Sequence, residues 1–432
     1  MKKRIAMALV AGMLISSVCG VVNVSAYEAG SFEGVSITML NTKSEIQQQL
    51  EAAAELWGEA TGATLEVYTI GSGSPSQEIA ARYAAKNAPT LIMGDPQDVA
   101  SICVEKAVDL SAEPWAAVGG EQYGITVDGT VYGFPFCIEG RGLIYNKTVI
   151  EELLGEAWDP ASVTNLDDFT ALLDKLVEAG MEAPVALNME DWSLAGHYLT
   201  QVYEQQDNTL ATTEQFMADL KAGSVDLEAN ERFTSLFNTF DVLKQYNISA
   251  ADPLAADYAT NVADVAEGTV AFYFNGNWCW GEMKDYYEEG VEVGIMPVPQ
   301  NEVSENELVK TTICGSATKH IMIDKECNDE TQQAAAKDFL NWLVDTEEGV
   351  NVLINECSIV PAFSTIDQEA TNPLAVSVQN YAKAGLLADA PSSYPGDHWQ
   401  MMGATMQKYL ADQIDRAGLA DEIEAYWAAL AE

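Results

Sequence analysis

Positive charge is scarce in this chain. Its 432 residues include 21 Lys and Arg against 66 Asp and Glu, so the net charge is −45. Charge of this sign repels nucleic acid phosphates, and no basic stripe along the sequence offsets it. The composition therefore argues against DNA or RNA as a partner. Hydrophobic residues make up 48% of the chain, which is typical of a globular protein rather than a disordered one.

Patterns for metal binding and nucleophilic catalysis are missing as well. There are three histidines, His197, His320 and His398, and none has a partner at metal-ligand spacing. No G-x-S-x-G motif occurs, and the glycine-rich stretch 71–76 lacks the Gly-Lys-Ser/Thr ending of a phosphate loop. We therefore expect no metal, no cofactor and no enzymatic activity. We interpret the histidines as satisfied structural residues.

Cysteine is sparse and irregularly spaced. Export would permit disulfides, but a chain of this length does not need them, and the sequence does not choose among the possible pairings. Scattered buried thiols are the interpretation that we favour. The cysteines that follow residue 26 are Cys103, Cys137, Cys279, Cys314, Cys327 and Cys357.

Long apolar runs are absent except near the N-terminus. Residues 2–4 are basic, residues 5–15 are apolar, and residues 24–26 (Val-Ser-Ala) resemble a cleavage site. This pattern predicts a signal peptide over residues 1–26 and an exported protein, extracellular or periplasmic. Two alternatives stay open. The apolar stretch could be retained as an anchor, or Cys19 could be lipidated, although the residues before Cys19 match a lipoprotein signal poorly.

Strand and helix patterns alternate in the first part of the chain. Residues 35–40, 64–70 and 89–95 are predicted strands, and two helical patterns separate them. Such alternation predicts an α/β fold with a parallel sheet, whose ligands bind beyond the carboxyl ends of the strands. Asn41 and Asp95 both stand at such ends.

The stretch "FPFCIEGRGLIYNK", residues 134–147, follows a predicted hairpin around Asp128-Gly129. It places a carboxylate, a guanidinium and two glycines before a predicted strand at 142–146. Further on, residues 164–245 are mostly helical, a buried strand precedes Gly276, and the chain ends in helices. This second half again alternates strands and helices.

Four stretches in order resemble the family 1 extracellular solute-binding proteins, the sugar-binding relatives of maltose-binding protein. They are the N-terminal strand–helix–strand pattern, "DGTVYGFPFCIEGRGLIYNKTVIEE" (128–152), "GTVAFYFNGNWCWGEMK" (268–284) and "AAAKDFLNWLVDTEEGVNVLINECSIVPAF" (334–363). Cys137 departs from the family pattern, but it is a small residue there. The resemblance spans residues 33–430.

The resemblance implies the two-lobed, type II periplasmic-binding-protein fold, with a ligand cleft between lobes that close about a hinge. It implies an ABC importer protein, monomeric, that hands its solute to permease subunits. Gly140 and Gly142 would allow a bend where the chain leaves the first lobe. We expect lobe 1 to comprise 27–138 and 295–355, lobe 2 to comprise 139–294 and 356–432, and crossings near 138–140, 292–296 and 354–358.

A sugar site needs aromatic platforms for C–H faces and paired polar groups for hydroxyls. Trp278 matches the family's stacking position, and Trp192 and Trp399 begin helices where further walls are expected. Trp57, Trp342 and Trp427 stand at core spacing instead. The polar candidates are Glu139, Arg141, Asn275, Asp95 and Asn41, with Asp397 and His398 as weaker ones.

We therefore expect a carbohydrate-binding protein of an ABC importer. Three alternatives stay open: a binding protein for another solute, such as a polyamine or a peptide; a secreted glycoside hydrolase, which would also use carboxylates; and a surface adhesin. The sequence leaves the identity and length of the sugar undetermined.

Overall fold

The computed structural model describes residues 30–70, 75–301, 307–388 and 394–431. The predicted signal peptide, its cleavage site and Cys19 lie outside these ranges. Within them, no helix combines the length and the apolar character needed to cross a membrane.

The first strands pair as the alternating pattern predicts. β1 (Ser36–Asn41) runs parallel to both β2 (Thr64–Thr69) and β3 (Leu91–Gly94). Helix α1 (Gln47–Thr61) connects β1 to β2 and ends at Gly62, whose φ of +78° is left-handed and therefore suits glycine. The parallel α/β arrangement of this region is confirmed.

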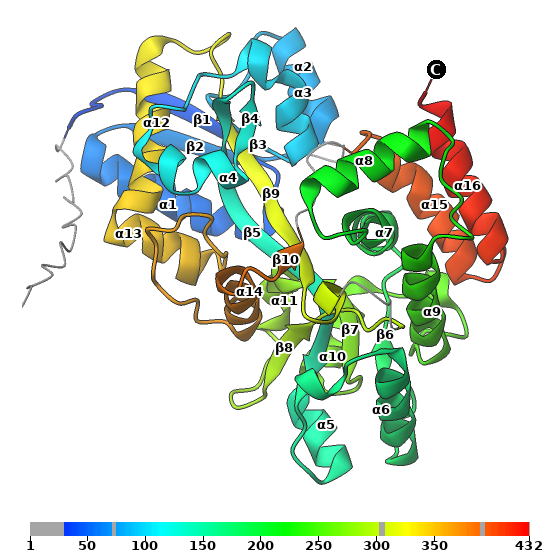
Figure 1. The fold of residues 1–432 in the computed structure, drawn as a ribbon. Coiled ribbons are helices and arrows are strands. Elements are labelled where there is room, and N and C mark those ends of the chain that lie inside the picture. Colours follow the sequence, from blue (N-terminus) through cyan, green and yellow to red (C-terminus); the bar gives the residue numbers. More distant parts are fainter. Residues whose placement is uncertain (1–29, 71–74, 302–306, 389–393, 432) are drawn as a thin grey trace, which may run out of the picture.

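Two long strands join the two sides of the molecule (Figure 1). The middle of β5 (Thr130–Asn146), residues 134–141, pairs with β9 (Ile313–Ile323). Its last part, residues 141–146, pairs with β7 (Phe272–Gly276) and β8 (Val293–Met296). The main strand order is β2-β1-β3-β9-β5-β7-β6, where β6 is Val185–Ala186, and one sheet thus passes from the first side into the second.

The predicted hairpin is present, and the strand that follows it begins earlier than predicted. β4 (Ile125–Val127) pairs with β5 across Asp128 and Gly129, which both have positive φ. β5 then continues through Gly140 and Gly142, so the expectation of a strand starting only at residue 142 is wrong. The register shifts instead beside Cys137.

The two glycines of β5 serve close packing. A Cβ at Gly140 would lie 2.9 Å from Ile313 Cδ1, and one at Gly142 would lie 2.3 Å from the carbonyl oxygen of Met296. A larger residue at position 142 would push β8 away, and one at position 140 would press against the side chain of Ile313. Glycine is therefore required there for a reason other than the conformational freedom that the sequence suggested.

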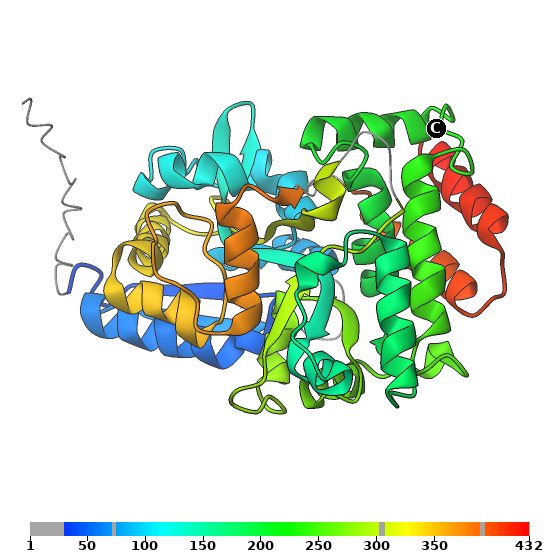
Figure 2. The ribbon, with the colours of Figure 1, turned by 60° about the horizontal axis from the view of Figure 1, so that its bottom comes forward.

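Helices gather in two groups on either side of β5 and β9 (Figures 1 and 2). One group, which includes α1, packs on the first strands, and the other encloses a separate hydrophobic core. Trp57, Trp342 and Trp427 are buried in these cores, as predicted. The fold is mixed α/β and two-lobed. The first group includes α12 (Glu330–Asp345) and α13 (Glu347–Asn351), and the second α6 (Leu166–Glu178), α7 (Thr200–Glu204), α8 (Leu210–Lys221), α9 (Glu231–Gln245), α15 (His398–Leu410) and α16 (Arg416–Ala429).

Shorter or peripheral elements complete the described chain. The six described cysteines form no disulfide, and all but the half-buried Cys327 are buried, as the scattered-thiol interpretation expects. The remaining strands and α-helices are α2 (Pro75–Ala84), α3 (Pro96–Lys106), α4 (Gly120–Tyr123), α5 (Lys147–Leu154), β6 (Val185–Ala186), α10 (Tyr258–Glu267), α11 (Trp280–Met283), α14 (Pro373–Lys383) and β10 (Leu387–Ala388).

Candidate functional site

A cavity of about 640 Å³ is lined by side chains from both sides of the molecule and from the strands that join them. The loops after β1 and β3 contribute, as the parallel topology predicts for the carboxyl ends of strands. The segments that supply the other walls lie far apart in the sequence: β5, β9, the π-helical turn η4 (Trp192–Leu199), α7, α10, the turn η6 (Asn277–Cys279), α11 and α15.

Three tryptophans and a histidine make the aromatic wall of the cavity. The ring of His197 lies 4.6 Å from that of Trp278, 5.3 Å from Trp192 and 6.2 Å from Trp399, measured between centroids. Tyr258 extends the wall at 5.6 Å from Trp192. These rings come from four segments, so the fold concentrates apolar faces that the sequence keeps separate.

Glycines let two of these indoles lie against the backbone. A Cβ at Gly196 would approach Trp399 Cε2 to 2.8 Å, and one at Gly276 would approach Trp278 Cζ3 to 2.1 Å. Side chains at these positions would displace the rings. The placement of the aromatic wall thus depends on these two glycines as well as on the rings themselves.

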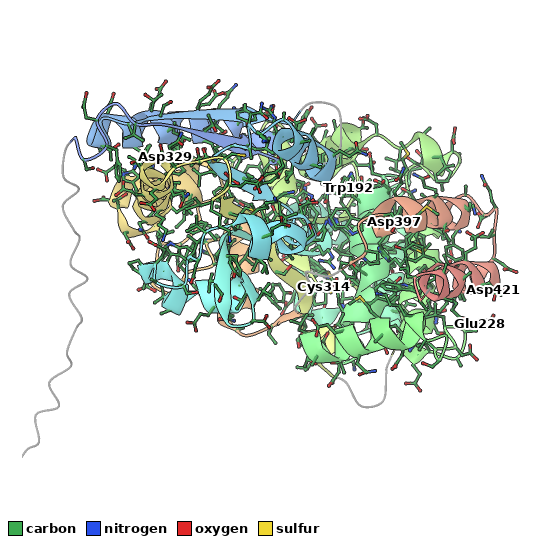
Figure 3. All side chains as sticks on the ribbon, turned by 90° about the horizontal axis from the view of Figure 1, so that it is seen from above. Trp192, Glu228, Cys314, Asp329, Asp397 and Asp421 are labelled. Atoms are coloured by element: carbon green, nitrogen blue, oxygen red, sulfur yellow. The ribbon has the colours of Figure 1, made fainter. Side chains whose placement is uncertain are left out.

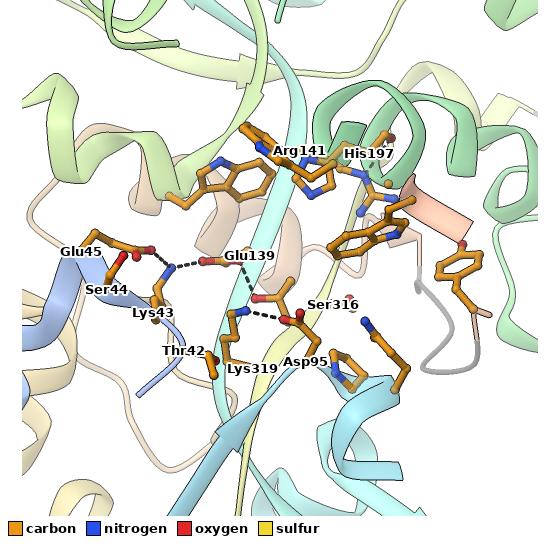
Figure 4. Close-up of a pocket in the computed structure, with 18 of the residues that line it drawn as sticks. Thr42, Lys43, Ser44, Glu45, Asp95, Glu139, Arg141, His197, Ser316 and Lys319 are labelled. Carbon is orange, nitrogen blue, oxygen red and sulfur yellow. Dashed lines mark hydrogen bonds and ion pairs between the residues drawn. The ribbon is translucent and has the colours of Figure 1, made fainter. Parts of the chain in front are cut away.

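The charged wall of the cavity lies opposite (Figure 4). Lys43 Nζ contacts Glu139 Oε1 at 2.6 Å and Glu45 Oε1 at 2.7 Å, and Thr318 donates a hydrogen bond to the other oxygen of Glu139. Burial alone would raise the pKa of Glu139, but the charge and hydrogen bond of Lys43 outweigh it, and the pKa is lowered. Glu139 is therefore held as a carboxylate.

A second ion pair of this wall joins Lys319 on β9 to Asp95 beyond β3. Burial acts to lower the pKa of Lys319, yet the Asp95 carboxylate reverses that effect and raises it. The side chains are only 17% and 15% exposed, so solvent screens this pair weakly.

Arg141 is held by a third pair at the end of the aromatic wall. Its Nη2 donates to Glu204 Oε1 at 2.6 Å and to Thr200 Oγ1 at 3.0 Å, and its Nε donates to the carbonyl oxygen of His197. Tyr394 donates to the same oxygen of Glu204 at 2.9 Å. Burial acts against the Arg141 charge, but Glu204 raises its pKa. The guanidinium is thus fixed in one orientation.

His197 differs from the satisfied structural histidine that the sequence suggested. It lines the cavity, and its Nδ1 has no hydrogen-bond partner among the described residues. Burial, and then the charge of Arg141, hold its pKa well below the ordinary value, so the imidazole is neutral at physiological pH. A neutral ring can pack with the indoles and still offer one polar edge.

Six of the eight predicted ligand residues line the cavity: Glu139, Arg141, Asp95, Trp192, Trp278 and Trp399. The other two are buried and support the neighbouring backbone. Asn41 Oδ1 accepts from the Lys43 backbone N–H at 2.8 Å, and Asn275 Oδ1 accepts from that of Gly276 at 3.0 Å. Asp397, which is labelled in Figure 3, and His398 do not line the cavity.

Sequence reasoning missed several charged and hydroxyl-bearing residues of the cavity. Lys43 had a usable signal, because it follows the predicted parallel strand 35–40 by three residues. Glu204 and Lys319 had none, because they lie within apolar helical and strand patterns without a recognisable motif. The unpredicted liners with polar side chains include Thr42, Lys43, Glu45, His197, Glu204, Tyr258, Glu282, Thr318, Lys319 and Tyr394.

The description "bacterial extracellular solute-binding protein" belongs to a family model that matches residues 51–384. The chain belongs to this family. The resemblance drawn from the sequence is therefore confirmed, and this family consists of binding proteins. No curated protein matches the sequence.

Solved solute-binding proteins share the fold at low identity. RafE in complex with raffinose is 17% identical, with a TM-score of 0.73, over 92% of this chain and 100% of that one. A sugar transporter from Bacillus licheniformis in complex with stachyose is 18% identical, with a TM-score of 0.67, over 92% and 100%. A family 1 extracellular solute-binding protein from Bifidobacterium longum subsp. infantis is 19% identical, with a TM-score of 0.66, over 92% and 100%.

Proposed function

We propose that this solute-binding protein captures a sugar or oligosaccharide in the cavity and delivers it to the permease subunits of an ABC importer. The observation that carries the proposal is the aromatic wall facing fixed polar groups. Indole faces suit the C–H surfaces of a sugar ring, and carboxylates, amines and the guanidinium suit its hydroxyls. Similar folds hold raffinose and stachyose, which agrees with this chemistry.

The protein acts by binding, without catalysis, and as an exported monomer. The ligand contacts both walls, and closure of the lobes about the crossings near 138–140, 292–296 and 354–358 is favoured by contacts made only in the closed state. The division into 27–138 with 295–355 and 139–294 with 356–432 describes the two moving bodies. Predicted export through residues 1–26 agrees with a family of extracellular proteins.

A thermal-shift screen of the purified protein tests the proposal. Neutral mono- and oligosaccharides are compared with polyamines, amino acids and short peptides. A ligand at a hundred times its dissociation constant should stabilise the fold by about 2.7 kcal/mol. A shift with one sugar class supports the proposal, whereas a shift with an amine or a peptide alone would leave the fold unchanged and overturn the substrate.

Two further outcomes point to the other functions considered. Release of shorter sugars during incubation, followed by chromatography, would indicate a glycoside hydrolase. Absence of a shift with every small molecule would favour an adhesin. Assignment to an importer is tested separately, by sugar-dependent binding of the protein to membrane vesicles that contain the candidate permease, with ligand-free protein as the control.

A further inference from the structure

Every cationic side chain of the cavity is already paired with a carboxylate of the chain. Lys43 contacts Glu139, Lys319 contacts Asp95, and Arg141 contacts Glu204. The partners in each pair come from different segments, separated by 96, 224 and 63 residues. The fold therefore neutralises each cation separately, although the chain as a whole has far more acids than bases.

The carboxylates left over lie in contact with solvent. Glu45 shares Lys43 with Glu139, and Glu282 has no cationic contact among the described residues. Both residues are exposed, so water can solvate their charge. The deeply placed part of the cavity, where Glu139 and Glu204 are less than a tenth exposed, has no unpaired charge of either sign among the described side chains.

A charged ligand would gain little from such a cavity. It loses its hydration on entry, and the opposite charge that would compensate is already engaged. A carboxylate also meets the acid of each pair, and an ammonium group meets the base. The repulsion between the charged ligand and the like-charged member of each pair outweighs its attraction to the other member, which is already engaged.

A hydroxyl, in contrast, can use the pairs as they stand, because it both donates and accepts. Arg141 shows what remains available. Its Nε and Nη2 bind the chain, while its Nη1 has no hydrogen bond to any described residue, although Arg141 lines the cavity. The guanidinium thus offers donors to a ligand oxygen without a net charge around it.

We propose that the ligand is an uncharged saccharide, and that the three ion pairs are specificity determinants that exclude uronic acids, amino sugars and polyamines. The inference rests on the proposed sugar-binding function. It assigns Asp95 and Glu204 a role as partners that cancel a cation, in addition to any contact with the ligand.

The first test compares derivatives of one sugar by calorimetry. The neutral sugar that binds best in the screen is converted, at one primary hydroxyl at a time, to a carboxylate or to an amine. We expect every charged derivative to bind about 100-fold more weakly, or worse. Tighter or equal binding of a charged derivative would overturn this inference while leaving sugar binding intact. Failure of all sugars, neutral and charged, would instead overturn the proposed function and this inference with it.

The second test inverts the selectivity. Asp95→Asn leaves Lys319 unpaired and should improve binding of the acidic derivative, relative to the neutral sugar, by about tenfold or more. Lys319→Met leaves Asp95 unpaired and should do the same for the amine derivative. Glu204→Gln tests binding of the acidic derivative in the same way at Arg141. Because Glu204 is fully buried, this variant is the one that can fail to fold. The more accessible Asp95–Lys319 pair then still provides the test.

Glu422→Gln is the matched control. It breaks a more exposed ion pair with Lys408 outside the cavity, at 2.8 Å between α15 and α16. Its ratio of neutral to charged affinities should equal that of the unaltered protein. Unchanged ratios in both Asp95→Asn and Lys319→Met would show that the pairs do not determine specificity.

Discussion

The two walls of the cavity are stabilised by different physical means. The rings of the aromatic wall, Trp192, Trp278 and Trp399, are partly exposed and lie against the backbone or against His197. The charged wall consists of buried and half-buried groups that hold one another through ion pairs. Loss of an indole should therefore weaken ligand binding and leave the stability of the fold nearly unchanged. Loss of a charge should affect the fold first, because its partner stays behind in a low-dielectric site.

The largest effect on stability is expected at Arg141, at the end of the aromatic wall. Arg141→Met leaves Glu204 fully buried without its cation, and we expect the free energy of unfolding to fall by about 3–5 kcal/mol. Denaturant unfolding measures it. Lys408→Met, which breaks an exposed pair, should cost only about 0–1 kcal/mol. Similar losses for the two variants would contradict the distinction between buried and exposed pairs.

An aromatic substitution should show the opposite signature. Trp278→Ala is expected to weaken binding of the sugar by about 2 kcal/mol or more, roughly 30-fold, with little change in unfolding. Titration calorimetry gives the affinity. Trp280→Ala is the control, since Trp280 packs against Tyr287 at 4.9 Å and does not line the cavity. Equal losses of affinity in the two variants would remove the special role of Trp278.

The pH dependence of stability tests the charged wall alone. The pKa of Glu139 is lowered in the folded state, so its carboxylate contributes stability above the ordinary value of 4.5, and this contribution is lost as pH falls through the folded pKa. Glu139→Gln should therefore be less stable than the unaltered protein at pH 7, by about 1–3 kcal/mol.

The difference between these two proteins should shrink as the pH falls below 4.5. Unfolding curves of both, recorded from pH 7 downward, provide the measurement. Because all other acids are shared, they cancel in the difference. A gap that stays constant or widens in acid would mean that Glu139 is not held as a carboxylate.

The smallest effect is expected from the glycine behind Trp399. In Gly196→Ala the new Cβ would come within 2.8 Å of the indole, so the ring must shift, and we expect about a tenfold loss of affinity. Gly418→Ala, in α16, is the control, because its nearest neighbour would lie at 3.4 Å. Unaltered affinity in Gly196→Ala would show that the ring position does not matter.

Much of the fold could be predicted from local patterns in the sequence. Strand and helix patterns, with Asp128-Gly129 as the turn, were enough for the first strands and the hairpin, because each depends on residues that are close in the sequence. The same locality explains why the sequence did not reveal the packing role of Gly140 and Gly142. Glycine has two uses, and the one that applies here depends on Ile313 and Met296, which approach from distant segments.

The candidate site divides in the same way. The sequence by itself determined the α/β pattern and the family, and it singled out the tryptophans and Glu139 through motifs of adjacent residues. Only the tertiary structure decided that Glu204 would meet Arg141 across 63 residues and that Lys319 would meet Asp95 across 224. A chain with 66 acids offers many possible partners to each base. Coulomb energy depends on distance and burial, and these exist only once the strands and helices have packed together.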